Sequence, residues 1–289
     1  MADSGDTVTE NTSQPVRAYL QQRQNEVLEY RREFETALGC LPEETPVYQY
    51  QSVTRLKSAV HTLDADGGYC VFVNVPMRAV DEELEEQKIG RITYYRFLRI
   101  LVVKMPGECH EAATSWLDTA IAMKVTAMGM QLHKELYFMR STRRHHKEPN
   151  SSYRPMTLPA GRLPLWPSVV VETGRSEAHA ALFHDAQQWF QKSSGLIQNV
   201  ITVKVARQCI TITRYIPREQ TENGCQPEPV QTVIVQTARE SPAHITGGPF
   251  IIPFRELFLR DPIQDQGNLV FTNDEMRSWA EWALMAHGI

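Results

Sequence analysis

The segment Pro167-Ser168-Val169-Val170-Val171-Glu172-Thr173-Gly174 is the most informative stretch of the sequence. Its three consecutive valines are typical of a strand that is buried on both faces of a sheet. The strand ends in a carboxylate, Glu172, and then in a glycine that lets the chain turn sharply. Because ligands of open α/β sheets bind beyond the strand ends, Glu172 is a candidate site residue.

A helix and a second buried strand follow this segment. Ser176-Glu177 is expected to cap a helix through residues 181–190, which Ser193-Ser194-Gly195 would end. Residues 200–205, Val-Ile-Thr-Val-Lys-Val, have the composition of another buried strand. A strand, a helix and a strand with short connections predict a parallel pair of strands. The core of this unit is expected to contain Val169, Val171, Ile201, Val203 and Trp189.

Composition and charge limit the class of protein. The chain has 289 residues, of which 42% are hydrophobic, so it can bury a sizeable core. Its net charge of −4 means that any contact with nucleic acid must come from a local patch. Five scattered cysteines without a Cys-x-x-Cys pair argue against a zinc site and a disulfide framework. With no signal peptide and no apolar run of membrane-spanning length, we expect an intracellular protein, in the cytoplasm or the nucleus.

The chain is expected to have three parts. Residues 1–14 are rich in Ser, Thr, Asp and Glu and are typical of a disordered tail. Residues 15–68 are predicted to form a helical N-terminal extension, whose first helix has only a narrow apolar stripe. That stripe is expected to pack on the outside of the domain or on a protein partner. Residues 69–289 are predicted to form one domain of the mixed α/β (α+β) class.

Further elements are predicted from periodicity and from turn residues. Strands are expected at residues 69–75, 92–97, 99–105, 136–139, 209–216 and 230–237. A long helix is expected from Cys109, with Met123 on its apolar face, and a last helix from Asn273, with Trp279, Trp282 and Leu284 facing inward. The segment 148–165, rich in Pro, Ser and Gly, is predicted to be a loop. No Walker loop, GxGxxG, GxSxG or HExxH motif occurs.

Several short motifs occur in an order that resembles a known group of proteins. They are Met105-Pro106, His110-Glu111, the run Lys147–Pro155, Pro167–Gly174 with Ser176-Glu177, and Asp185-Ala186 with Trp189. The succession resembles a large group of fungal proteins with a PD-(D/E)XK nuclease-like fold, which are similar in turn to bacterial Uma-type restriction endonucleases. The resemblance covers residues 91–205 well and the rest loosely. It implies a restriction-endonuclease-like mixed sheet flanked by helices.

The resemblance also implies a metal site. In nucleases of this fold, carboxylates hold Mg²⁺ and a nearby lysine orients or deprotonates the attacking water. Carried over to this sequence, Glu111 is the helix acid and Glu172 the central acid, while Asn150 occupies the usual aspartate position. The usual lysine position is Gly174, and Lys204 on the next strand is the nearest basic substitute. Because asparagine brings no negative charge, binding of Mg²⁺ by Glu111, Asn150 and Glu172 is expected to be weak.

A basic run leads directly to Asn150 and is a candidate surface for the phosphates of DNA or RNA. The run contains Arg140, Arg143, Arg144 and Lys147. The same residues also allow simpler interpretations: a solvated basic loop, a salt-bridging Glu172, a Glu111 that stabilises its helix start, and a surface Asp185. Two functions stay open, a metal-dependent nuclease and a catalytically inactive relative that keeps the fold as a binding or interaction module. The missing aspartate and lysine favour the second.

Overall fold

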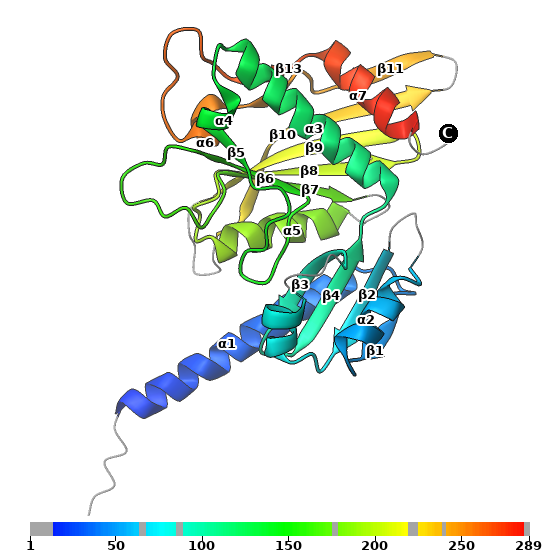
Figure 1. The fold of residues 1–289 in the computed structure, drawn as a ribbon, viewed down its shortest axis with the longest axis vertical. Helices are drawn as coiled ribbons and strands as arrows, with labels where there is room; N and C mark the ends of the chain where they lie inside the picture. The colour runs from blue at the N-terminus through cyan, green and yellow to red at the C-terminus, as the bar shows by residue number, and fades with distance from the viewer. Residues whose placement is uncertain are drawn as a thin grey trace, which may run out of the picture.

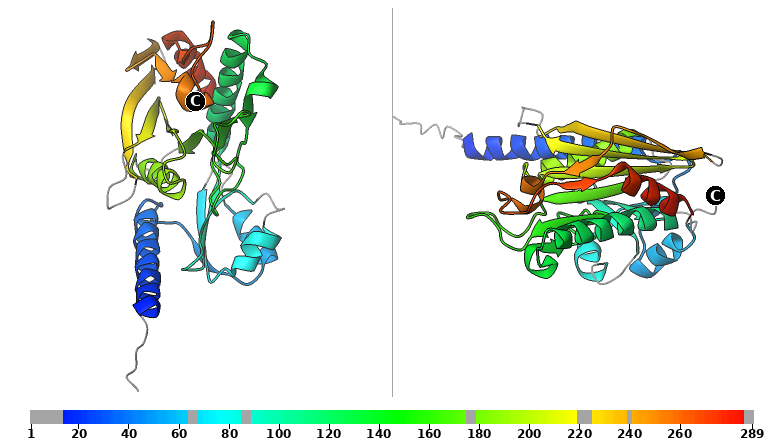
Figure 2. Two further views of the ribbon diagram at one scale, coloured as in Figure 1. Left: turned by 90° about the vertical axis from the view of Figure 1, so that its left-hand side faces the viewer. Right: turned by 90° about the horizontal axis from the view of Figure 1, so that it is seen from above.

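The computed structural model describes residues 14–63, 68–84, 89–174, 179–218, 225–238 and 241–285. A large and a small sheet lie one beyond the other along the long axis, and helix α1 (Gln14–Gly39) projects past the small sheet (Figures 1 and 2). Residues 1–13 of the predicted tail and the predicted cap Ser176-Glu177 lie outside the described residues. The predicted mixture of helices and strands is confirmed.

Within the described residues the large sheet has seven strands, in the order β11-β10-β9-β8-β7-β6-β5. Their bounds are β5 Leu136–Phe138, β6 Ser151–Pro155, β7 Val169–Gly174, β8 Asn199–Ala206, β9 Cys209–Pro217, β10 Pro227–Ala238 and β11 Ser241–Thr246. Strands β7 and β8 are parallel, with Val169 opposite Asn199 and Gly174 opposite Lys204. The other neighbouring pairs are antiparallel. The parallel pair predicted from the sequence is therefore confirmed.

Helices cover both faces of this sheet. On one face α3 (Glu108–Ala127) and α7 (Asn273–Met285) pack over Val169 and Val171. On the other face α5 (His179–Lys192) packs over Val170, because successive side chains of a strand point to opposite faces. Five residues were predicted to be buried here and all are fully buried: Val169, Val171, Ile201, Val203 and Trp189.

The small sheet has the order β1-β2-β4-β3. Its strands are β1 Val47–Gln49, β2 Gly68–Val73, β3 Arg91–Tyr95 and β4 Ile100–Met105. Helix α2 (Val53–Val60) and a π-helical turn (Ala79–Glu83) pack on it. The predicted boundary between residues 68 and 69 falls inside β2, and β1 pairs with β2 in parallel. Residues 15–68 are therefore not a separate helical extension, since part of them belongs to this sheet.

Other differences from the predictions have local reasons. Strand β6 lies within residues 148–165, which were predicted to be a loop. Its sequence, Ser-Ser-Tyr-Arg-Pro, has neither the alternation nor the β-branched run from which a strand is predicted. Met123 and Trp282 are exposed because each falls just outside the buried stripe of its helix. The remaining elements are α4 Leu132–Glu135, β12 Phe250–Ile252, α6 Phe254–Phe258 and β13 Leu269–Phe271. In the described part of the chain, no helix combines the length and the apolar character needed to cross a membrane.

Candidate functional site

Glu172 lies inside the protein, near the end of β7, on the face that α5 covers. Its side chain is almost fully buried. The indole N–H of Trp189 donates a hydrogen bond to Glu172 Oε1 over 2.6 Å, and Lys147 Nζ lies 3.9 Å from the same oxygen. Two groups of the protein itself therefore hold this carboxylate.

Lys147 is shared between two acids. Its ammonium donates a hydrogen bond to Asp185 Oδ1 and lies 5.6 Å from the centre of the Trp189 ring. Lys147 is as deeply buried as Glu172. We call Lys147, Glu172, Asp185 and Trp189 the buried charge cluster. Because a buried charge is tolerated only when it is paired and hydrogen-bonded, these four side chains form one interdependent unit.

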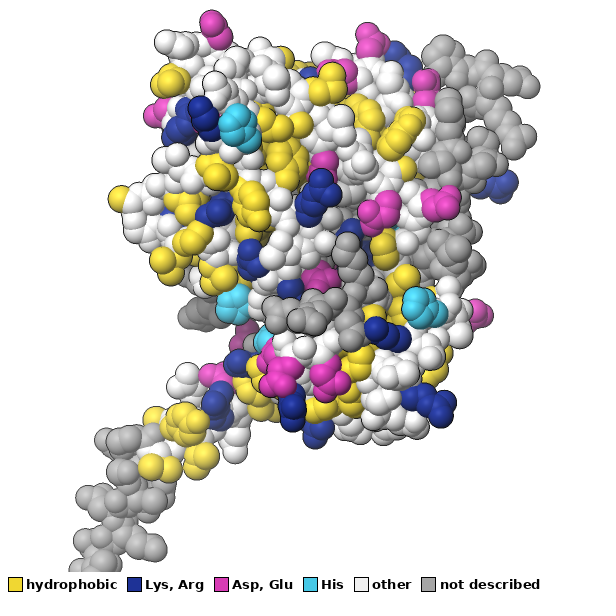
Figure 3. All heavy atoms as spheres, in the orientation of Figure 1, with side chains coloured by type: hydrophobic (Ala, Val, Ile, Leu, Met, Phe, Trp, Pro, Cys, Tyr) yellow, Lys and Arg dark blue, Asp and Glu magenta, His cyan; other side chains and the backbone are white. Residues whose placement is uncertain are grey.

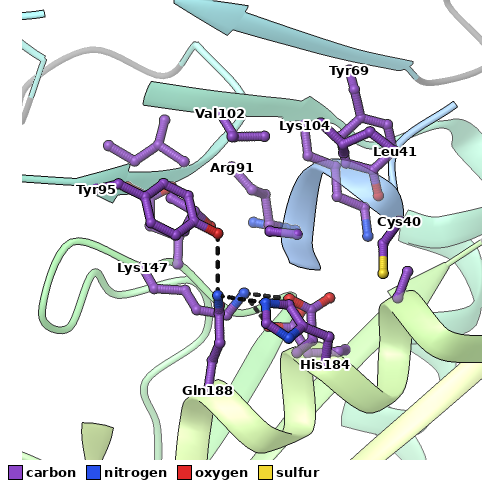
Figure 4. A pocket seen from close by; sticks show the side chains of 17 residues that line it. Cys40, Leu41, Tyr69, Arg91, Tyr95, Val102, Lys104, Lys147, His184 and Gln188 are labelled. Carbon is purple, nitrogen blue, oxygen red and sulfur yellow. Dashed lines mark hydrogen bonds and ion pairs between the residues drawn. The ribbon is translucent and has the colours of Figure 1, made fainter. Parts of the chain in front are cut away.

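Lys147, Glu172 and Asp185 of the buried charge cluster line a small cavity, about 70 Å³ in volume, between the small sheet and α5. In Figure 4, Arg91, Tyr95 and Lys104 approach this cavity from the small sheet, and His184 and Gln188 approach it from α5. Gln188 of α5 donates a hydrogen bond to the Tyr95 hydroxyl of β3 over 3.2 Å, and Lys104 of β4 donates to the Thr173 carbonyl over 2.8 Å. The cavity can hold a few water molecules, and its polar walls join the two sheets.

The two carboxyl groups have pKa values displaced in opposite directions. Burial and the negative charge of Asp185 raise the pKa of Glu172 to about 7, although Lys147 and Lys104 counteract this rise. Burial also acts to raise the pKa of Asp185, but the charges of Lys147 and Lys104 outweigh it and hold that pKa below its usual value. Burial acts to lower the pKa of the Lys147 ammonium, but the negative charges of Asp185 and Glu172 outweigh it and raise that pKa. The ion pair is therefore Lys147 with Asp185.

This arrangement predicts a pH-dependent stability. The pKa of Glu172 is higher in the folded than in the unfolded chain, so the stability due to its protonated form is present below about pH 4.5 and lost as the pH rises through 7. Relative to Glu172→Gln, which keeps an acceptor for the Trp189 N–H, the wild type should lose roughly 3 kcal/mol of unfolding free energy between pH 5 and 8. Urea unfolding at several pH values measures both curves. Parallel curves would contradict this prediction.

Glu111 does not meet Glu172. The Glu111 side chain is more than half exposed on α3, and Arg91 Nη2 donates to it over 2.8 Å. Thr173, the neighbour of Glu172, hydrogen-bonds Thr114 of α3 over 2.9 Å. Since side chains alternate along β7, Glu172 faces away from α3. The predicted convergence of Glu111, Asn150 and Glu172 is therefore wrong.

Asn150 presents a donor where a metal ligand was expected. It is almost fully buried, and its Oδ1 accepts a hydrogen bond from the Thr173 backbone N–H over 3.1 Å. This bond fixes the amide orientation and leaves Nδ2 with no hydrogen-bond partner among the described residues. An N–H donor cannot coordinate a cation, so Glu111, Asn150 and Glu172 do not fit Mg²⁺. In the described part of the chain, no three His, Cys, Asp or Glu side chains are grouped to hold a metal ion.

The lysines near Glu172 are not the predicted one. Lys204 lies on β8 opposite Gly174, whereas Lys147 and Lys104 are the lysines whose charges act on Glu172. Lys147 stands three residues before Asn150 in the motif run and closes the basic run, but neither signal paired it with Glu172. Lys104 carries no such signal, because the fold brings it from a different sheet. The catalytic role predicted for Lys204 stays a prediction, since its charge is not among those that act most on Glu172.

The predicted basic surface is partly turned inward. Lys147 is buried in the charge cluster, and Arg143 pairs with Glu148 over 2.9 Å and donates to the Val80 carbonyl. Arg144 donates to the Leu165 carbonyl over 2.7 Å. Arg140 is exposed and forms no ion pair among the described residues. Lys147 is therefore removed from the predicted phosphate-binding set.

A second cavity, which we call the α3 cleft, lies on the other face of the sheet and has a volume of about 880 Å³. Its charged and amide-bearing lining residues are Arg91, Glu111, Asp118, Arg140, Arg143, Arg144, Glu148 and Asn150. Four arginines and three acids give a formal charge of +1 (4 − 3), and two of the acids are already paired with arginines. Burial raises the pKa of the third acid, Asp118, although Tyr153 and Ser151 donate hydrogen bonds to it.

Comparison of the chain with protein-family models, with curated proteins and with solved structures finds no match.

Proposed function

We propose that this protein is a catalytically inactive relative of the PD-(D/E)XK nucleases that binds the phosphate backbone of DNA or RNA in the α3 cleft without a metal ion. The observation that carries the proposal is the Asn150 amide: the residue lines the cleft, and its buried Nδ2 has no acceptor among the described residues. A buried donor without a partner is costly, and a ligand acceptor would relieve that cost.

The chemistry of Asn150 explains the choice of ligand. A carboxylate at this position would repel a phosphate unless a cation lay between them, whereas an amide N–H donates directly to a phosphate oxygen. Arg140, exposed at the same cleft, supplies positive charge without an acid paired to it among the described residues. The resemblance noted in the sequence implies that this region lies where nucleases of the fold hold phosphate.

Metal-dependent cleavage is the other candidate function. The helix acid, the Asn150 loop and the central strand occur in the order that the resemblance implies. The central acid, however, is held by Trp189 and faces Lys147, on the sheet face opposite to α3. This geometry supports binding over hydrolysis.

Asn150→Asp tests the proposal directly. The variant replaces the Asn150 amide, which lines the cleft, with a negative charge, so binding of a fluorescein-labelled 20-nucleotide DNA or RNA should weaken by roughly tenfold or more. Fluorescence anisotropy measures the affinity, with EDTA and with Mg²⁺. At matched ionic strength Mg²⁺ should not strengthen wild-type binding, and neither buffer should give cleavage.

Two control variants make the result specific. Arg207→Ala removes an exposed arginine from the β8–β9 turn, and Lys204→Met removes the lysine first expected to be catalytic; both should bind like the wild type.

Arg140→Gln should lower the dependence of log K on log salt by about one unit. Tighter Mg²⁺-dependent binding in Asn150→Asp, or wild-type cleavage that Glu172→Gln abolishes, would overturn the proposal in favour of a nuclease.

A further inference from the structure

Helix α1 carries an apolar stripe that continues beyond the body of the protein. At its C-terminal end the stripe is buried, since Phe34 packs edge-on against Tyr95 at 5.0 Å between ring centres. Toward the N-terminus the same face carries Val16, Leu20 and Val27, which are 49%, 54% and 42% exposed. Figure 3 shows apolar side chains, in yellow, on the projecting helix. On this part of the helix, Val16, Leu20 and Val27 belong to no hydrophobic cluster of the described residues, whereas the Arg23 guanidinium lies 6.0 Å from the centre of the Phe97 ring.

The residues of the stripe are spaced along the sequence as they are where two helices pack side by side. Positions 16, 20, 23 and 27 are separated by four, three and four residues, the alternation that keeps side chains on the seam of two packed helices. Arg23 occupies one seam position, and arginine covers apolar neighbours with its aliphatic stem. Polar side chains elsewhere on the helix bond to each other, such as Arg31 with Glu35 and Gln21 with Asn25. The polar faces are thus satisfied within the helix.

We propose that the N-terminal half of α1 pairs with the same segment of a second copy of this chain, in antiparallel orientation. A two-fold axis between Gln21 and Gln22 would set Val16 against Val27 and Leu20 against Arg23 of the other copy. Residues 14–21 carry one arginine and no acid, whereas residues 22–29 carry one arginine and two glutamates. An antiparallel pair therefore places a net positive half against a net negative half at both ends.

The length of the free segment sets the strength of the dimer. Pairing centred between residues 21 and 22 ends near residue 29, before Phe34 begins to pack on the body. Two helical segments of this length bury less than the roughly 1,200 Å² of a stable interface, so the dissociation constant should lie in the micromolar range. The contact uses neither the α3 cleft nor the buried charge cluster.

Sedimentation velocity of the full chain between about 2 and 200 µM tests this pairing, with a reversible monomer–dimer shift expected in the micromolar range. Leu20→Glu should leave only monomer. Leu28→Glu is a matched control, because Leu28 is 56% exposed on the same helix but lies about 80° around the axis from Leu20, outside the stripe. It should dimerise like the wild type.

Cysteine cross-linking tests the orientation. A mixture of the Val16→Cys and Val27→Cys variants should form a disulfide-linked heterodimer, with little Val16→Cys homodimer; the wild type under the same oxidation corrects for the native cysteines. A monomeric wild type at 200 µM overturns the proposal, as does an equal loss of dimer in Leu20→Glu and Leu28→Glu. Efficient Val16→Cys homodimers would overturn the antiparallel arrangement.

Discussion

Lys147→Met is expected to lower the free energy of unfolding by about 3 kcal/mol, because it leaves Asp185, a carboxylate only 22% exposed, without its cation. Methionine fills a similar volume, so the loss reflects charge rather than packing. Urea unfolding at pH 7, followed by tryptophan fluorescence and by circular dichroism, measures it.

A double variant separates the charge effect from any packing defect. Lys147→Met with Asp185→Asn removes both charges of the ion pair, and much of the lost stability should return. Lys147→Met alone should not change the salt dependence of nucleic-acid binding, because this lysine does not reach the surface. A folded Lys147→Met protein that loses less than about 1 kcal/mol would show that the ion pair has no structural role.

Trp189→Ala is the second substitution with a large expected effect, about 3–5 kcal/mol of unfolding free energy. Trp189 is fully buried between α5 and the large sheet, and its N–H holds Glu172. The alanine variant loses the packing of the ring and leaves a cavity beside two charged groups. Denaturant unfolding with an unchanged m-value would identify the loss as one of native-state stability.

Trp189→Phe provides the matched control. Phenylalanine keeps most of the apolar volume but cannot donate to Glu172 Oε1, so the cost should be about 1–3 kcal/mol. This variant should also raise the pKa of Glu172 further, because the N–H bond favours the charged carboxylate. A Trp189→Ala protein as stable as the phenylalanine variant would mean that the ring contributes nothing beyond its hydrogen bond.

The core of the large sheet was predictable from the sequence for a local reason. Two β-branched runs flanking an amphipathic helix leave few arrangements other than a parallel pair buried on both faces, and β7, α5 and β8 form that unit. Strand β6 could not be found in this way, because its polar residues form a strand only when β5 and β7 pair with it on both sides. The membership of β1 in the small sheet depends likewise on β2.

The sequence by itself identified Glu172 as an acid at the end of a buried strand, and the tertiary structure decided which side chains meet it. Glu172, Asn150 and Glu111 were predicted to share one site, but alternation along β7 sends Glu172 toward α5 while Thr173 faces α3. Lys147 reaches Glu172 and Asp185 across 25 and 38 residues of chain. Contacts over such separations follow from the packing of whole elements, which no local pattern encodes. For this reason the residues of the candidate metal site are divided between a largely buried ion pair on one face of the sheet and, on the other, a cleft lined by Asn150, whose Nδ2 has no acceptor among the described residues.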